Sequence, residues 1–334
     1  MKIGIIFIIF FALTISIFAN DSRVIVGRTV EIIDNEDTNI IMRTAEINIT
    51  LHRGYYEVDV HYVFYNSGST ATVLLGFPID INVMNIPEAI AEARLKDFRT
   101  YINGAILPEY TIMEESSVDD RGWYITIRRW YIREVEFPGN SYTNSRVTYK
   151  APYNHGGFFL SAGYVFGTAR NWKGSIERLS ITIDHGDHIL ITGIELWPNS
   201  PFRFIWEADG RYMFEAENIN PSLSGQINIG IEQIDDMWRS WDGGFGNIFE
   251  GWIWDRYLLY RNETYIRYLT RNQVRLFINL FYARHGFNFR SPFWRDHFQQ
   301  FEQYKINENF SENNFNEFER RNIDFLLRIE RMIP

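Results

Sequence analysis

Apolar and polar residues alternate with a period of two through most of the first two thirds of the chain, and this feature limits the fold most. From residue 24 to about residue 233, short runs of β-branched and aromatic residues are separated by turn residues. Residues 47–51 alternate in this way, and the alternation resumes over residues 58–64, after Arg53 and Gly54. Such alternation is typical of antiparallel strands that bury one face. We therefore predict a hairpin here.

The same region contains a series of further strand candidates. Asn103 and Gly104 lie between apolar residues and form the strongest short signal for a tight hairpin. Pro78 follows another run, and because proline cannot donate a hydrogen bond to a sheet, we expect that strand to stop before it. Many short strands without intervening long helices favour an antiparallel sandwich over an α/β core. The other predicted strands cover residues 72–77, 123–131, 146–149, 176–184, 189–196, 202–206, 212–216 and 226–231.

The period changes to that of a helix in the last quarter of the chain. Thr270 and Gln273 have the spacing of a capping box, and Gly286 stands where a helix commonly ends. A last helix is predicted over residues 315–332, with an apolar stripe that Asn322 interrupts. Several turns of amphipathic helix therefore follow the strands.

The two patterns together predict an α+β multidomain protein, in which a mainly antiparallel, sandwich-like β domain is followed by a small all-α domain. A Gly- and Trp-rich segment separates them, and a composition shift of this kind marks a domain boundary. We place a signal peptide at residues 1–19, the β-rich domain at 20–236, the Gly/Trp-rich linker at 237–254 and the helical domain at 255–334.

The first residues have the pattern of a secretory signal peptide. Lys2 precedes an apolar run over residues 3–13, and the small residue Ala19 stands at a suitable cleavage position. The alternative is a retained N-terminal anchor, since the stretch over residues 3–18 is about as long as the shortest membrane-spanning helices, roughly 17 residues. Cleavage would place the mature chain outside the cytoplasm, either in a periplasm or secreted.

The composition excludes several classes of function. The chain has no cysteine, which removes disulfides, thiolate metal sites and cysteine nucleophiles. Its net charge of -9 comes from interleaved acidic and basic residues, so nucleic acid is not an expected partner. No second long apolar stretch follows the signal, so we do not expect an integral membrane protein. The 10 tryptophans fit either core packing or stacking platforms for glycans.

One cluster combines several residue types that can bind metals. Asp184, His185, Asp187 and His188 surround Gly186 between two strand-like runs. Asp and Gly are also ordinary turn residues, so a turn is the favoured interpretation and a metal site the weaker one. We expect no bound cofactor. The sequence contains no known hydrolase motif, although paired carboxylates for glycoside hydrolysis stay possible.

The helical region contains the motif Tyr282-Ala283-Arg284-His285-Gly286. Through this motif it resembles the YARHG domain, a helical module of bacterial exported proteins that is named after these five residues. The resemblance covers residues 255–333 and includes residues 319–323 in the last helix. The β-rich region more loosely resembles an exported bacterial family of unknown function, through residues 63–66, 76–78 and 164–176. Both resemblances imply an exported protein and neither implies a chemical activity.

We expect the charged residues of the Tyr-Ala-Arg-His-Gly motif to have a structural role. Asn322 occupies a position in an apolar stripe, so its amide is expected to be buried and to need partners. Arg284 and His285 are the nearest candidates, and we predict that the three residues form one polar cluster; the alternative is ligand capture by Arg284. For the whole chain we expect a non-catalytic extracytoplasmic binding or envelope-associated protein, with a hydrolase of cell-wall glycan or peptide as the alternative.

Overall fold

The computed structural model covers most of the β-rich and helical regions. No helix of these described residues is long and apolar enough to cross a membrane. The predicted signal peptide and the Gly/Trp-rich linker lie outside them. The structure describes residues 24–28, 31–32, 39–87, 90, 95–107, 109–156, 159–167, 172–186, 189–197, 202–208, 210–220, 225–233, 269–301 and 304–333.

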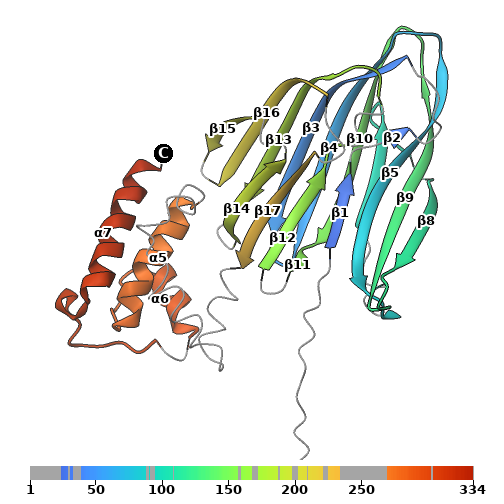
Figure 1. Cartoon of the computed structure of the whole chain (residues 1–334). Coiled ribbons are helices and arrows are strands. Elements are labelled where there is room, and N and C mark those ends of the chain that lie inside the picture. Colours follow the sequence, from blue (N-terminus) through green and yellow to red (C-terminus); the bar gives the residue numbers. More distant parts are fainter. Residues whose placement is uncertain are drawn as a thin grey trace, which may run out of the picture.

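Two sheets pack face to face and form a β-sandwich (Figure 1). All neighbouring strands are antiparallel except the pairs β1–β12 and β13–β3. The nine-stranded sheet has the order β14 (Ile189–Trp197), β17 (Gln226–Gln233), β12 (Phe159–Val165), β1 (Val24–Arg28), β5 (Ala71–Met84), β9 (Tyr124–Phe137) and β8 (Thr111–Val118), with β11 (Asn154–Gly156) beside β12 and β2 (Glu31–Ile32) beside β5. The eight-stranded sheet has the order β15 (Arg203–Ala208), β16 (Arg211–Ile219), β13 (Ile176–His185), β3 (Ile40–His52), β4 (Tyr55–Asn66), β10 (Ser141–Pro152), β6 (Lys96–Ile102) and β7 (Ala105–Leu107).

The core of the sandwich is built from alternate residues of the strands. The predicted first hairpin is confirmed, because β3 and β4 pair with Ile47 opposite Val60, and both side chains are buried. Buried tyrosines also join the two sheets: the hydroxyls of Tyr62 and Tyr164 lie 2.8 Å apart, and that of Tyr56 donates to a carbonyl of β12. Burial raises the pKa of Tyr56, so this hydroxyl stays a donor.

The second predicted hairpin is also confirmed. Asn103 and Gly104 connect β6 and β7 with φ values of 48° and 83°. Two consecutive positive φ values match the right-handed twist of the flanking strands, which explains why Asn-Gly stands here.

The prediction that a strand stops at Pro78 is wrong. β5 continues through Pro78 to Met84, with Pro78 opposite Trp130 of β9. On its other side β5 pairs with β1 as far as Ile79 and with β2 from Gly76, so Pro78 falls between these two ladders. A proline costs no ladder hydrogen bond at such a gap.

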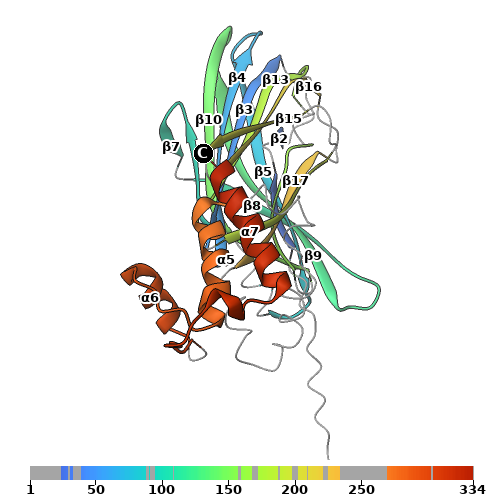
Figure 2. The ribbon, with the colours of Figure 1, turned by 90° about the vertical axis from the view of Figure 1, so that its left-hand side faces the viewer.

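The helical region has its own hydrophobic core, separate from that of the sandwich. It contains α5 (Arg271–Arg284), α6 (Pro292–Gln299), the short 3-10 helix η4 (Glu312–Asn314) and α7 (Glu317–Met332). α5 and α7 pack side by side, with α6 apart from them (Figure 2). The capping box of Thr270 and Gln273 is present. α7 begins after an Asn316 cap, slightly later than predicted.

The helices lie at the end of the sandwich formed by β14 and β15 (Figure 1). The Gln273 side chain donates to the carbonyl of Ile189, at the start of β14, over 2.5 Å. Gly210 lies between the two parts: a Cβ there would be 2.9 Å from the carbonyl of His185 and 3.3 Å from the Thr270 methyl. The α5 cap therefore packs directly against the loops of the sandwich.

Candidate functional site

The Tyr-Ala-Arg-His-Gly motif lies at the end of α5, where the chain turns sharply. Gly286 follows the helix with a φ of 77°, a conformation that favours glycine. A Cβ at this position would lie 2.4 Å from the carbonyl of Lys305 and 2.8 Å from the amide of Asn307. That amide donates to the Gly286 carbonyl over 2.8 Å. Glycine is thus required by both the turn and the close approach of the next segment.

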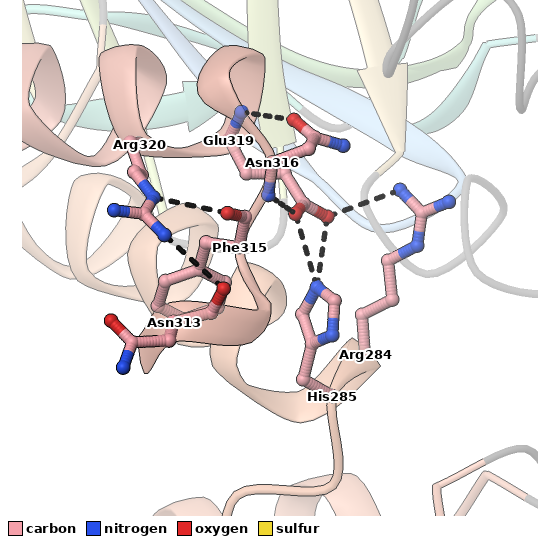
Figure 3. Close-up of polar contacts among 7 residues, drawn as sticks. All are labelled: Arg284, His285, Asn313, Phe315, Asn316, Glu319 and Arg320. Carbon is pink, nitrogen blue, oxygen red and sulfur yellow. Dashed lines mark hydrogen bonds and ion pairs between the residues drawn. The ribbon is translucent and has the colours of Figure 1, made fainter. Parts of the chain in front are cut away.

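Arg284 and His285 meet on the carboxylate of Glu319 (Figure 3). His285 Nε2 lies 3.1 Å from both carboxylate oxygens, and Arg284 Nη1 lies 3.5 Å from one of them. Glu319 also completes the capping box of α7, since it accepts from the amide of Asn316 over 2.9 Å. The side chain of Glu319 is only 2% exposed, so these donors compensate a buried carboxylate.

Tyr282 connects the same turn to η4. Its hydroxyl donates to Glu312 Oε1 over 2.9 Å, and its ring packs edge-on against Phe287 and Phe315. Partial burial, together with the hydrogen bond to Glu312, raises the pKa of Tyr282 to about 12. Tyr282, Arg284, His285 and Gly286 therefore all make contacts within the helical region.

The predicted place of Asn322 in this cluster requires a correction. Asn322 is buried, at 1% exposure, but neither its Oδ1 nor its Nδ2 has a hydrogen-bond partner among the described residues. Glu319, one turn earlier on α7, takes the position that we assigned to Asn322. A signal for this was present in the sequence, because Asn316 and Glu319 have capping-box spacing and place Glu319 at the start of α7.

The weaker metal candidates do not converge around His185. Its Nδ1 lies 3.1 Å from the carbonyl of Ile189 and must donate to it, which leaves Nε2 to accept from the Tyr212 hydroxyl at 3.4 Å. Both ring nitrogens are therefore engaged in protein contacts. Asp184 is exposed, and Asp187 and His188 lie outside the described residues. Within the described ranges, no group of three or more potential ligands could hold a metal ion.

Two adjoining clefts, which share Arg146, lie on the outer face of the eight-stranded sheet. Their volumes are about 360 Å³ and about 430 Å³. We call them together the Arg146 clefts. Volumes of this size are typical of sites for small ligands. Side chains that alternate with core positions of β3, β4, β6 and β10 line them, including Glu46, Asn48, Glu57, Asp59, His61, Asp97, Arg99, Tyr101, Arg146 and Lys150.

Arg146 lies at the centre of these clefts, and an ion pair with Asp59 holds its guanidinium in place. Nε and Nη2 of Arg146 donate to the two oxygens of Asp59 over 2.8 and 2.7 Å. This bidentate hydrogen bond raises the pKa of Arg146. The guanidinium also lies 5.4 Å from the centre of the Tyr101 ring. His61 Nε2 also lies 3.1 Å from Asp59 Oδ1.

A second ion-pair cluster borders the same clefts. Lys150 Nζ lies 3.0 Å from Asp97 and 3.4 Å from Glu57. The hydrogen bond from Lys150 lowers the pKa of Asp97, which therefore stays ionised at neutral pH. The face thus presents fixed positive and negative groups beside an aromatic ring, an arrangement that can orient a polar ligand.

Sequence reasoning missed these clefts because they depend on the pairing of β4 with β10. The alternation assigns His61 to a solvent-facing position, but it does not reveal that Arg146 lies directly opposite His61. Opposite charges on the polar faces of two strands were the available signal.

Comparison with known proteins relates the chain to one solved structure over nearly its whole length. No family model matches the chain, and no match was found among curated proteins. A Legionella pneumophila protein named for a proposed role in nutrient binding is similar with a TM-score of 0.51 and 16% identity, over 92% of this chain and 99% of that protein. At this identity the similarity shows the fold, including both the β-rich and the helical parts.

Two further solved structures are similar over only part of the chain. They are an M1 zinc metallopeptidase from Deinococcus radiodurans and yeast LTA4 hydrolase, each with a TM-score of 0.30 and 10% identity. The matches cover 57% of this chain, and 42% and 29% of those proteins. Similarity at this level supports no conclusion about activity.

Proposed function

We propose that this chain is a non-catalytic, extracytoplasmic binding protein that holds a polar ligand in the Arg146 clefts. The observation that carries the proposal is the bidentate pair of Arg146 and Asp59 beside the Tyr101 ring, within clefts of ligand size. Fixed charges orient a ligand, and an aromatic ring offers it a stacking surface. The name of the Legionella pneumophila neighbour agrees with binding.

The ionisation of the clefts favours binding over hydrolysis. A glycoside hydrolase of the usual kind needs one carboxylic acid that is still protonated at working pH, so its pKa is raised. In the Arg146 clefts the pKa of Asp97 is lowered by Lys150, and Asp59 accepts two hydrogen bonds from Arg146. Asp97 is therefore better suited to fixing charge than to donating a proton, and both oxygens of Asp59 are engaged by Arg146.

The remaining parts of the chain complete this proposal. A signal peptide at residues 1–19 would direct export, and residues 20–236 would present the clefts. Residues 255–334 would form a YARHG-type domain, joined through the segment 237–254, in which Arg284 and His285 hold the fold through Glu319. A polar glycan of the cell envelope is the ligand class that best matches an aromatic ring between charged groups.

Incubation of the purified mature protein with labelled cell-wall glycan fragments tests the proposal. The protein should retain fragments, and mass spectrometry should recover them unchanged after prolonged incubation. Shortened fragments would establish the hydrolase alternative. Failure to retain any fragment would refute a glycan ligand.

Two matched variants test whether the glycan fragments bind at the Arg146 clefts. Arg146→Gln removes the central cation of the clefts, whereas Arg178→Gln removes a comparable exposed ion pair with Glu215 on another part of the same sheet. Exposed pairs contribute little stability, about 0–1 kcal/mol, so both variants should fold. Retention should fall only with Arg146→Gln.

A further inference from the structure

Arg133 is a buried cation that has no carboxylate partner in the described structure. Its side chain extends from β9 into the sandwich and is 4% exposed. Nη2 donates to the Ser145 hydroxyl over 2.9 Å, but Nε and Nη1 have no hydrogen-bond partner among the described residues. Burial lowers the pKa of Arg133 to about 10, so the group is still charged at neutral pH.

Arg129 provides an internal comparison on the same face of the same strand. It is buried to a similar degree, at 5% exposure, but its guanidinium pairs with the carboxylate of Glu114 on β8. A buried charge is costly unless it is paired and hydrogen-bonded. The two arginines therefore differ in their counter-charges: Glu114 pairs with Arg129, whereas no carboxylate among the described residues pairs with Arg133.

Two further buried hydroxyls without hydrogen-bond partners lie near Ser145 in the sheet register. The hydroxyls of Thr143 and Thr100 are buried and have no partner among the described residues. Thr143 lies two residues from Ser145 on the same face of β10, and Thr100 lies opposite Val147, two residues farther along. Hydroxyls can donate to an oxyanion, so they complement an arginine in binding one.

An open cleft of about 740 Å³ reaches Arg133 at the edge of the sandwich. β8 pairs with β9 only as far as Thr111 opposite Ile132, so the edge of β9 is free of β8 from Arg133 onward. Leu107, Tyr110 and Ile132 line the cleft with apolar surface, and the exposed Glu109 and Glu134 add negative charge.

We propose that this cleft binds an α-amino acid with an apolar side chain, with the carboxylate on Arg133 and the ammonium group beside Glu109 and Glu134. The carboxylate would supply the counter-charge that Arg133 lacks, in a bidentate geometry that guanidinium favours. The apolar walls accommodate the side chain. This site is separate from the Arg146 clefts, so either proposal can fail without the other.

Isothermal titration of the full-length mature protein with three matched probes tests the assignment. L-phenylalanine has a carboxylate, an ammonium group and an apolar side chain. Phenethylamine lacks the carboxylate, and phenylpropionate lacks the amine. We expect L-phenylalanine to bind, phenethylamine to bind about tenfold more weakly or not at all, and phenylpropionate to lose a smaller factor. Absence of L-phenylalanine binding, or equal binding of phenethylamine, would overturn the proposal.

Arg133→Met separates binding from folding. Methionine has a similar length without charge, and replacement of an uncompensated buried cation by an apolar residue is often neutral or stabilising. The variant should keep its thermal midpoint and lose L-phenylalanine binding, whereas Arg128→Gln, which removes an exposed pair with Asp80, should keep both. Unchanged affinity in Arg133→Met would contradict the assignment.

A second variant keeps the test decisive if Arg133→Met does not fold. Glu109→Gln combined with Glu134→Gln changes only exposed side chains. This double variant should bind L-phenylalanine more weakly, and its affinity for phenylpropionate should be almost unchanged. Equal weakening of both probes would exclude the proposed position of the ammonium group.

Discussion

The side-chain amide of Gln273, in the cap of α5, donates to the main-chain carbonyl of Ile189 at the start of β14, over 2.5 Å. The same carbonyl lies 3.1 Å from Nδ1 of His185. At its other end, Gln273 accepts from the amide of Thr270 over 3.0 Å and so closes the capping box. One side chain therefore both starts a helix and attaches it to the sandwich.

Gln273→Glu should separate these two roles. A glutamate still accepts from Thr270, but it cannot donate to Ile189 and places a negative charge near that carbonyl. We expect the free energy of unfolding to fall by about 1–3 kcal/mol, because the Ile189 carbonyl keeps only His185 as a donor and a buried carboxylate replaces the Gln273 amide. Urea unfolding measures this. Gln273→Ala should lose at least as much, because it also removes the capping box; an undiminished stability in Gln273→Glu would contradict the contact with Ile189.

His285 and Glu319 should be energetically coupled. Their side chains touch at 3.1 Å, so His285→Ala and Glu319→Ala should show a coupling energy of about 0.5–3 kcal/mol in a double-mutant cycle. The matched control is the cycle of Arg284→Ala with Asn322→Leu. The side-chain amide of Asn322 has no hydrogen-bond partner among the described residues, so the effects of these two substitutions should be additive. Coupling in the control cycle and none in the first would restore the original assignment of Asn322.

Asn322→Leu should not destabilise the protein. Both polar atoms of Asn322 are buried without partners among the described residues, and leucine has the same branched shape without the desolvation cost of an amide. We expect the free energy of unfolding to rise by about 1–3 kcal/mol. Asn322→Asp, which adds a charge in the same shape, should lower it. A large loss with leucine would show that the amide is hydrogen-bonded.

Alkaline pH should destabilise the helical region through Tyr282. The pKa of Tyr282 is raised to about 12, against about 10 in an unfolded chain. The folded state therefore favours the protonated form, and its contribution is complete below about pH 10 and is lost as pH rises toward about 12. Denaturant midpoints across this range should fall more steeply for the natural protein than for Tyr282→Phe. Parallel curves would contradict the shift.

The local patterns of the sequence predict the elements of this fold well, but they do not predict how distant elements meet. Alternation identified β3 and β4 because each buries one face against a core. It missed β8, whose residues are all exposed and whose Glu-Glu-Ser-Ser segment has no apolar period. It also could not reveal that β3 pairs in parallel with β13, because this ladder joins strands that are far apart in the chain.

The same limit applies to the sites. The turn at Gly286 could be predicted from the sequence because the positive φ of the glycine is a local property of the chain. The pairing of Arg146 with Asp59 requires β4 and β10 to be neighbours, and the isolation of Arg133 requires the packing of two sheets. Chemistry that depends on contacts between sheets or strands does not appear in residue spacing.

The affinity of the Arg146 clefts for a retained cell-wall glycan fragment tests the central proposal most directly. Calorimetric titration should give saturable binding by the natural protein and by Arg178→Gln, and a Kd about tenfold or more higher for Arg146→Gln, since a hydrogen bond to a charged group contributes about 1.5–3 kcal/mol. The fragment recovered afterwards should be intact. Equal affinity in all three proteins, or a cleaved fragment, would contradict a non-catalytic binding site at Arg146.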